Sequence, residues 1–115
     1  MIDKSLQTGS TSMLVLKLIE EKDMYGYEMI EKLAQKSNNV FSLKAGTLYP
    51  LLKSLEDKGL VKSYEKNADS LRVRKYYSIT PKGKKYLKEK KNEWDLFTSA
   101  VNNIMKGGDL LVTIS

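Results

Sequence analysis

The chain of 115 residues contains no cysteine and no histidine. Without cysteine it can form no disulfide bond and carry out no thiolate chemistry, which fits a reducing cytoplasm. Without histidine it lacks the commonest general base and the commonest transition-metal ligand. We therefore expect a protein that is not an enzyme and that holds neither a metal ion nor a cofactor.

Long apolar runs are missing as well. No segment approaches the roughly 20 apolar residues that a membrane-spanning helix needs, and the N-terminus has no signal-peptide pattern. The composition, 41% hydrophobic and 30% charged, is that of a folded protein, and the length suits one small domain. We expect a cytoplasmic protein with no membrane partner.

Positive charge is abundant, and it is confined to the middle of the chain. Residues 44–91 carry a net charge of +9, whereas residues 1–43 and 92–115 carry −1 and −2. A basic segment of this kind is typical of a protein that binds a polyanion such as nucleic acid. The alternative is a lysine-rich surface that only keeps the protein soluble.

Apolar periodicity predicts four helices and one β-hairpin. The helices are expected over residues 5–21, 24–37, from either about 45 or 48 to 58, and 81–105; Thr80 would cap the last one and Pro81 would be its first residue. Segments 60–66 and 72–79 are rich in β-branched and aromatic residues and predict a hairpin with a five-residue loop.

Three helices followed by a hairpin form the order of a winged helix-turn-helix. We therefore predict a mainly α (α+β) fold with three parts. These are a winged helix-turn-helix DNA-binding domain over residues 1–80, a C-terminal dimerisation helix over 81–106 and a tail over 107–115.

The third helix would be the one that reads DNA. Its apolar residues Leu48, Leu51, Leu52 and Leu55 recur at helical spacing and would hold it to the body. Pro50 interrupts this pattern, and two registers tolerate it. Either Thr47 caps the helix and the missing N–H of Pro50 is not needed, or the helix begins near Ala45 and the unpaired carbonyl is that of Gly46.

Other basic residues follow in the hairpin and the last helix. Arg72 and Arg74 lie on one face of the predicted second strand and Lys75 on the other. Arginine on a hairpin suits phosphate contacts, although charges also protect an edge strand from aggregation. Residues 82–91 hold six lysines, which attract DNA non-specifically or simply form a solvated face.

The last helix carries a seam of apolar residues at heptad-like spacing: Leu87, Trp94, Phe97, Val101 and Ile104. Lys90 interrupts this seam one turn before Trp94. The simplest interpretation is core or a dimer interface. The sharper one is an aromatic wall for a flat apolar ligand held between subunits.

Four stretches of the chain resemble the PadR-type winged-helix transcriptional regulators, in their short subfamily with a single C-terminal helix. They are YGYEMIEKL (25–33), AGTLYPLLKSLEDKGLV (45–61), RKYYSIT (74–80) with PKG following, and EWDLF (93–97). They stand in the family's order over roughly residues 10–105, and the chain is similar to the multidrug-sensing members.

This resemblance implies a homodimer that binds a palindromic operator in double-stranded DNA, usually as a repressor released by a small, planar aromatic effector. By matched position it implies DNA contacts from Thr47, Tyr49, Pro50, Lys53, Arg74 and Lys75. Lys44 and Arg72 complete the predicted DNA-binding set. The ligand site implied by the resemblance comprises Met13, Leu16, Trp94, Thr98 and Val101.

A second hypothesis stays open. A winged-helix module could bind a ligand or a protein without recognising specific DNA, in which case its basic groups would serve solubility. The two hypotheses differ in whether Tyr49 and Lys53 matter for regulation.

Overall fold

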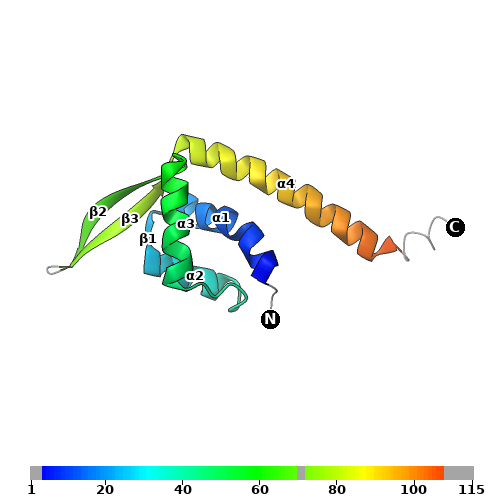
Figure 1. Ribbon diagram of the computed structural model, residues 1–115, viewed down its shortest axis with the longest axis horizontal. Coiled ribbons are helices and arrows are strands. Elements are labelled where there is room, and N and C mark those ends of the chain that lie inside the picture. The colour runs from blue at the N-terminus through cyan, green and yellow to red at the C-terminus, as the bar shows by residue number, and fades with distance from the viewer. Residues whose placement is uncertain (1–3, 70–71, 108–115) are drawn as a thin grey trace.

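The computed structural model describes residues 4–69 and 72–107. Its elements are α1 (Lys4–Glu21), β1 (Met24–Tyr25), α2 (Gly26–Lys36), α3 (Ala45–Asp57), β2 (Val61–Asp69), β3 (Arg72–Ile79) and α4 (Pro81–Met105). The first three helices gather into a body, the hairpin leaves it on one side and α4 on the other (Figure 1). The predicted winged helix-turn-helix, mainly α with a β wing, is confirmed.

The wing belongs to a three-stranded antiparallel sheet in the order β1-β3-β2. The hairpin register aligns Val61 with Ile79 and Tyr64 with Tyr76, and a bulge follows near Asn67. The outgoing strand therefore runs three residues further than its predicted end. β1 was missed altogether, because it has only two residues, which pair with Tyr77 and Tyr76.

The core forms where α1, α2, α3 and the base of the sheet meet. The second half of α1 contributes Val15, Leu16 and Ile19, which are at most 2% exposed. Leu48, Leu52 and Leu55 of α3 face the same core, as expected from their spacing. Together with Tyr77 and Val61 of the sheet they fix the position of α3 against the wing.

The first turn of α4 is joined to the end of α3. Thr80 caps α4 by accepting a hydrogen bond from the Gly83 N–H at 2.9 Å, as predicted. The Thr80 hydroxyl also donates to the Gly59 carbonyl at 2.7 Å, and the Lys82 amine donates to the Lys58 carbonyl at 2.8 Å. Gly59 has φ +76°, the left-handed conformation expected just after a helix.

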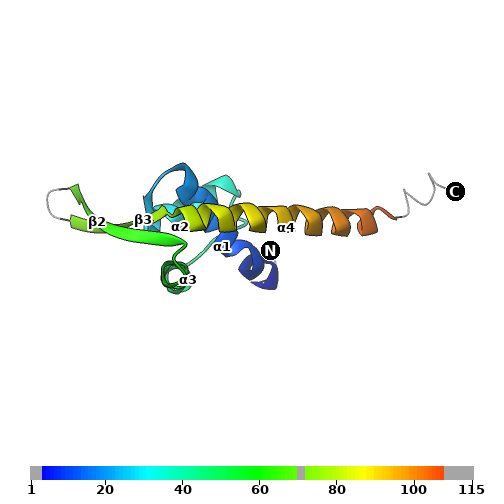
Figure 2. The same ribbon diagram turned by 90° about the horizontal axis from the view of Figure 1, so that it is seen from above.

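Beyond this joint α4 extends away from the body, on the side opposite the hairpin (Figure 2). The radius of gyration is 17.5 Å, whereas a compact chain of this length has about 13 Å. The second half of α4 therefore lies outside the body of its own chain. The predicted tail falls largely on residues 108–115, which lie outside the described residues.

Candidate nucleic-acid interface and ligand cavity

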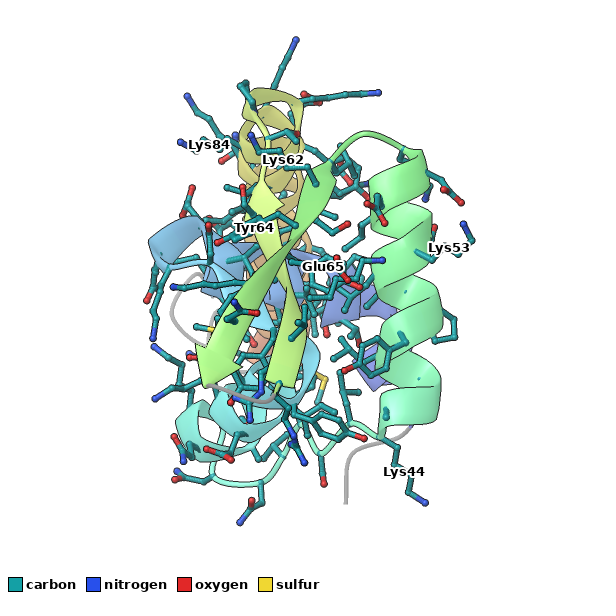
Figure 3. All side chains as sticks on the ribbon, turned by 90° about the vertical axis from the view of Figure 1, so that its left-hand side faces the viewer. Lys44, Lys53, Lys62, Tyr64, Glu65 and Lys84 are labelled. Carbon is teal, nitrogen blue, oxygen red and sulfur yellow. The ribbon has the colours of Figure 1, made fainter. Side chains whose placement is uncertain are left out.

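The exposed side of α3 carries the residues predicted to contact DNA. Leu48, Leu52 and Leu55 turn into the core, so the opposite side presents Lys44, Thr47, Tyr49, Pro50 and Lys53, all exposed. Figure 3 looks along the hairpin toward the body and shows Lys44 and Lys53 projecting from α3 away from the sheet. The five α3-side predictions therefore all lie on exposed surface of α3 and its N-cap.

The position of Pro50 is now defined. α3 begins at Ala45 with Lys44 as its N-cap, so Pro50 lies inside the helix, in its second turn. The N–H groups of Thr47 and Leu48 both bond to the Lys44 carbonyl at 3.0 Å. The carbonyl that Pro50 leaves without its helical partner belongs to Gly46, around which no side chain crowds. Of the two registers considered, the second is the observed one.

The Tyr49 side chain packs against α2 and does not project freely into solvent. A Cβ on Gly26 would lie 2.8 Å from the Cε1 atom of Tyr49, so the ring occupies the space that glycine leaves open. The Tyr27 ring meets it edge-on with 6.3 Å between centroids. Burial, and then the neighbouring Tyr27 and Tyr77, raise the pKa of the Tyr49 hydroxyl. Tyr49 nevertheless keeps 38% of its surface exposed.

The face of the wing that looks toward α3 carries polar side chains that contact Glu56 of α3. Its carboxylate accepts a hydrogen bond from Ser63 at 2.6 Å and lies 4.0 Å from the Lys75 amine. The Lys75 amine also lies 5.7 Å from the centroid of the Tyr77 ring. The Lys75 side chain therefore lies on the α3 side of the wing; the alternation along β3 predicted only that it lies opposite Arg74.

The opposite face of the wing holds an aromatic cluster that the sequence reading missed. Tyr64 stacks on Tyr76 with centroids 5.8 Å apart, and Tyr76 meets Tyr25 edge-on at 5.4 Å. The guanidinium of Arg74 lies over the Tyr25 ring at 4.3 Å. The period-2 alternation along β2 and β3 contained this signal, but β1 was needed to bring Tyr25 beside it.

The cluster ends in a hydrogen bond to the loop before β1. The Tyr64 hydroxyl donates to the Asp23 carboxylate at 2.6 Å, and this bond raises the pKa of Tyr64. Figure 3 shows Tyr64 on β2, at the front of the molecule, with Lys62 near the base of the same strand.

Most of the predicted cations remain available for an anionic partner. Lys53 pairs with Asp57 at 3.5 Å and Lys75 with Glu56 at 4.0 Å, but both pairs are largely exposed and therefore weak. Among the side chains that the structure describes, Lys44, Arg72 and Arg74 form no ion pair within 4 Å.

A cavity of about 550 Å³ lies between α1 and α4. Its floor is formed by Met13, Leu14, Leu87 and Trp94, and its rim by the charged residues Lys17, Glu20, Lys84, Lys88, Lys91 and Asp95. A smaller cavity of about 370 Å³ on the other flank of Trp94 is also lined by Met13 and by Phe97. Met13 and Trp94, two of the predicted ligand residues, thus border both cavities.

The other three predicted ligand residues lie elsewhere. Leu16 has no exposed surface, because it is packed inside the core. Thr98 donates its hydroxyl to the Trp94 carbonyl at 2.9 Å, and Val101 is 39% exposed one turn further along α4. Neither Thr98 nor Val101 lines the two cavities described above.

The apolar seam of α4 divides into two parts. Leu87 is only 5% exposed and belongs to the core of its own chain, which corrects its prediction as an interface residue. Phe97, Val101 and Ile104 are 58%, 39% and 79% exposed, and the Trp94 ring lies 6.1 Å from that of Phe97. Lys90, which interrupts the seam, pairs with Glu93 at 3.2 Å, and this contact raises the pKa of Lys90.

The described part of the chain holds neither a metal-binding group nor a membrane-spanning helix. Within residues 4–69 and 72–107, no three histidine, cysteine, aspartate or glutamate residues form a group that could hold a metal ion. In the same part of the chain, no helix combines the length and apolar character needed to cross a membrane.

Comparison with known proteins gives one consistent result. Residues 15–89 match the model of the transcriptional regulator PadR-like family. An uncharacterized protein of Lysinibacillus sphaericus is 36% identical over 107 residues, which are 93% of this chain and 98% of the relative.

Solved structures of transcriptional regulators are also similar to this chain. A transcriptional regulator from Clostridium thermocellum is 35% identical with a TM-score of 0.83, covering 90% of this chain and 97% of the other. A PadR-family regulator from Eggerthella lenta is 32% identical with a TM-score of 0.79, covering 89% and 87%. A PadR-like regulator from Bacillus cereus is 33% identical with a TM-score of 0.78, covering 90% and 98%.

Proposed function

Because the chain belongs to the PadR-like family of transcriptional regulators, we propose that it is a cytoplasmic homodimer that represses genes by binding a palindromic DNA operator. The family's members regulate transcription through DNA and are not enzymes. Repression, dimer formation, the operator's symmetry and a response to a ligand belong to the proposal.

The observation that carries the proposal is the exposed N-terminal half of α3 beside a basic wing. In helix-turn-helix proteins the start of the recognition helix enters the major groove, and its side chains reach base edges. Thr47 and Tyr49 supply hydroxyl donors, Pro50 shapes the helix surface, and Lys44 and Lys53 supply charge for backbone phosphates. Arg72, Arg74 and Lys75 would extend phosphate contact along the wing.

Dimerisation is supported by the second half of α4. Its apolar side chains extend beyond the body of the chain, with Ile104 79% and Phe97 58% exposed. Apolar side chains on a protruding helix are stabilised when a second helix covers them. A second copy of α4 supplies the same surface and places two recognition helices on either side of a two-fold axis, which matches a palindromic operator.

A ligand response is supported by the cavity at Trp94. Its volume of about 550 Å³ and its floor of Met13, Leu14, Leu87 and Trp94 suit a small apolar molecule. A planar aromatic compound would gain most there, because it stacks on the indole ring. Thr98 and Val101 would extend the site along α4 once a partner helix encloses it.

Fluorescence anisotropy with labelled DNA from the protein's own promoter tests the central claim. We expect binding to that DNA at least about a thousandfold tighter than to random DNA of equal length, and a steep loss of affinity with added salt. Equal affinity for both DNAs would contradict specific recognition. Unchanged regulation in cells that carry Tyr49→Ala with Lys53→Ala would instead favour a module that does not use DNA.

A further inference from the structure

We propose that Tyr25, Tyr64 and Asp23 are positioning residues that hold Arg74 of the wing ready to bind a backbone phosphate of the operator. This inference rests on the proposed DNA-binding function. It assigns a role to the wing face that looks away from α3, where the Tyr25–Tyr76–Tyr64 cluster lies.

Arg74 is held by an aromatic ring. The Cζ atom of its guanidinium lies 4.3 Å from the Tyr25 ring centroid, a cation–π contact that holds the group over the ring. Such a contact needs none of the five N–H donors of the guanidinium, which can bind a phosphate through two parallel hydrogen bonds. No described carboxylate lies within ion-pair distance of Arg74, so its charge is not already neutralised.

Tyr25 in turn is held in place by the rest of the cluster. It belongs to β1, whose only two ladder pairs are Met24 with Tyr77 and Tyr25 with Tyr76. Tyr76 lies between Tyr25 and Tyr64, with ring centroids 5.4 Å and 5.8 Å away. The chain of contacts thus runs from Arg74 through Tyr25 and Tyr76 to Tyr64.

Asp23 holds Tyr64, which is the end of this series of contacts most distant from Arg74. It lies immediately before β1, and its carboxylate accepts the Tyr64 hydroxyl at 2.6 Å. The bond joins the outgoing strand of the wing to the loop that leads into β1, two segments 41 residues apart. Because the wing is a hairpin that protrudes from the body, such a bond limits its rotation relative to α3.

Tyr64→Phe tests this idea, because it keeps the stacked ring and removes only the hydroxyl. We expect operator affinity to fall about threefold to tenfold, and the slope of log affinity against log salt to decrease by about 0.9, the value for one lost phosphate contact. Hydroxyl-radical footprinting should lose protection where the wing meets the backbone and retain it where α3 lies. Tyr86→Phe, the same change on α4, is the matched control and should bind as the wild type does.

A double-mutant cycle distinguishes an effect of Tyr64 on the position of Arg74 from a general loss of structure. If Tyr64 acts through Arg74, Tyr64→Phe should cost little further affinity in an Arg74→Ala background. Additive losses, an unchanged salt slope, or loss of thermal stability with unchanged DNA binding would each overturn the inference. If the wild type itself shows no preference for its promoter, the proposed function fails instead, so the two failures are distinguishable.

Discussion

The Tyr49 ring rests on the backbone of Gly26, with its Cε1 atom 2.8 Å from the point where a Cβ of residue 26 would lie. This contact joins the first residue of α2 to the exposed face of α3. The short segment YGY therefore bears on the DNA contact proposed for Tyr49, because Gly26 determines where the Tyr49 ring lies.

Gly26→Ala is expected to displace the Tyr49 ring. Since Tyr49 is 38% exposed, its ring can swing outward, and alanine's better helix propensity, worth about 1 kcal/mol, offsets the strain. The free energy of unfolding should change by less than about 1 kcal/mol, while operator affinity falls about threefold to tenfold. Urea unfolding and fluorescence anisotropy measure the two quantities. In a Tyr49→Ala background the same change should leave affinity unaltered.

Pro50→Ala should separate stability from recognition. Alanine restores the N–H that pairs with the Gly46 carbonyl in the second turn of α3, so the free energy of unfolding should rise by about 1–3 kcal/mol. Operator affinity should fall, because the helix surface that faces the groove changes shape. Equal or tighter DNA binding by the more stable variant would show that Pro50 has no part in recognition.

Phe97→Asp should weaken the proposed dimer without unfolding the chain. Phe97 is 58% exposed and its described ring contact is with Trp94 on the same helix, so the body does not depend on it. Burying a phenylalanine contributes about 1.5–3 kcal/mol, so the dimer dissociation constant should rise at least tenfold. Analytical ultracentrifugation measures this change. Ser99→Asp, about half a turn around the helix, is the control that should remain dimeric.

Trp94 offers a direct probe of the cavity, because it is the only tryptophan in the chain. A planar aromatic compound that stacks on it should quench its fluorescence in a saturable manner and release labelled operator DNA over the same concentration range. Met13→Ala should weaken both effects, since Met13 borders the cavities on both sides of Trp94. Absence of quenching across phenolic compounds, dyes and antibiotics would count against an effector site here.

The charge of such a compound should matter as well. Among the described residues, Lys84 and Lys88 lie on the rim of the larger cavity without an ion pair, whereas Lys17 and Lys91 pair with Glu20 and Asp95. Of two aromatic compounds of equal size, the acidic one should therefore quench Trp94 at lower concentration in dilute salt. Replacing both lysines by glutamine should remove that difference, as should about 1 M salt.

Alkaline pH should destabilise the fold through Tyr77. Burial, and then the charge of Glu56, raise the pKa of Tyr77 above 10.0, so the folded state favours the neutral phenol. This contribution is fully present below the unfolded-state pKa of about 10 and is lost as the pH rises through the higher folded-state pKa. Urea midpoints measured from neutral to alkaline pH should fall less steeply for Tyr77→Phe than for the wild type.

The sequence predicted helices and strands where periodicity was long enough to be read. α1 and α4 matched within a residue, and the Thr80 cap was identified, because caps and heptad spacing act over neighbouring residues. β1 could not be predicted in this way, since two residues have no period. Its existence depends on pairing with Tyr76 and Tyr77, which lie about fifty residues later.

The site was harder to predict than the fold for a similar reason. Spacing along α4 groups Leu87 with Phe97 and Ile104, but only the packing of α1 decides that Leu87 is core while the others lie outside it. Leu16 was expected beside Met13 in the ligand site, yet it has no exposed surface and belongs to the core. The sequence shows where a residue lies around a helix, but it does not show which element packs against that residue.

The joint between α3 and α4 converts a small change of angle into a large displacement. It consists of the hydrogen bonds from Thr80 to the Gly59 carbonyl and from Lys82 to the Lys58 carbonyl, directly after the end of α3. The 25-residue helix α4 is about 37 Å long, so a tilt of about 5° at this joint moves its far end by about 3 Å. In a dimer held together by those far ends, a molecule wedged beside Trp94 would alter the span between the two recognition helices.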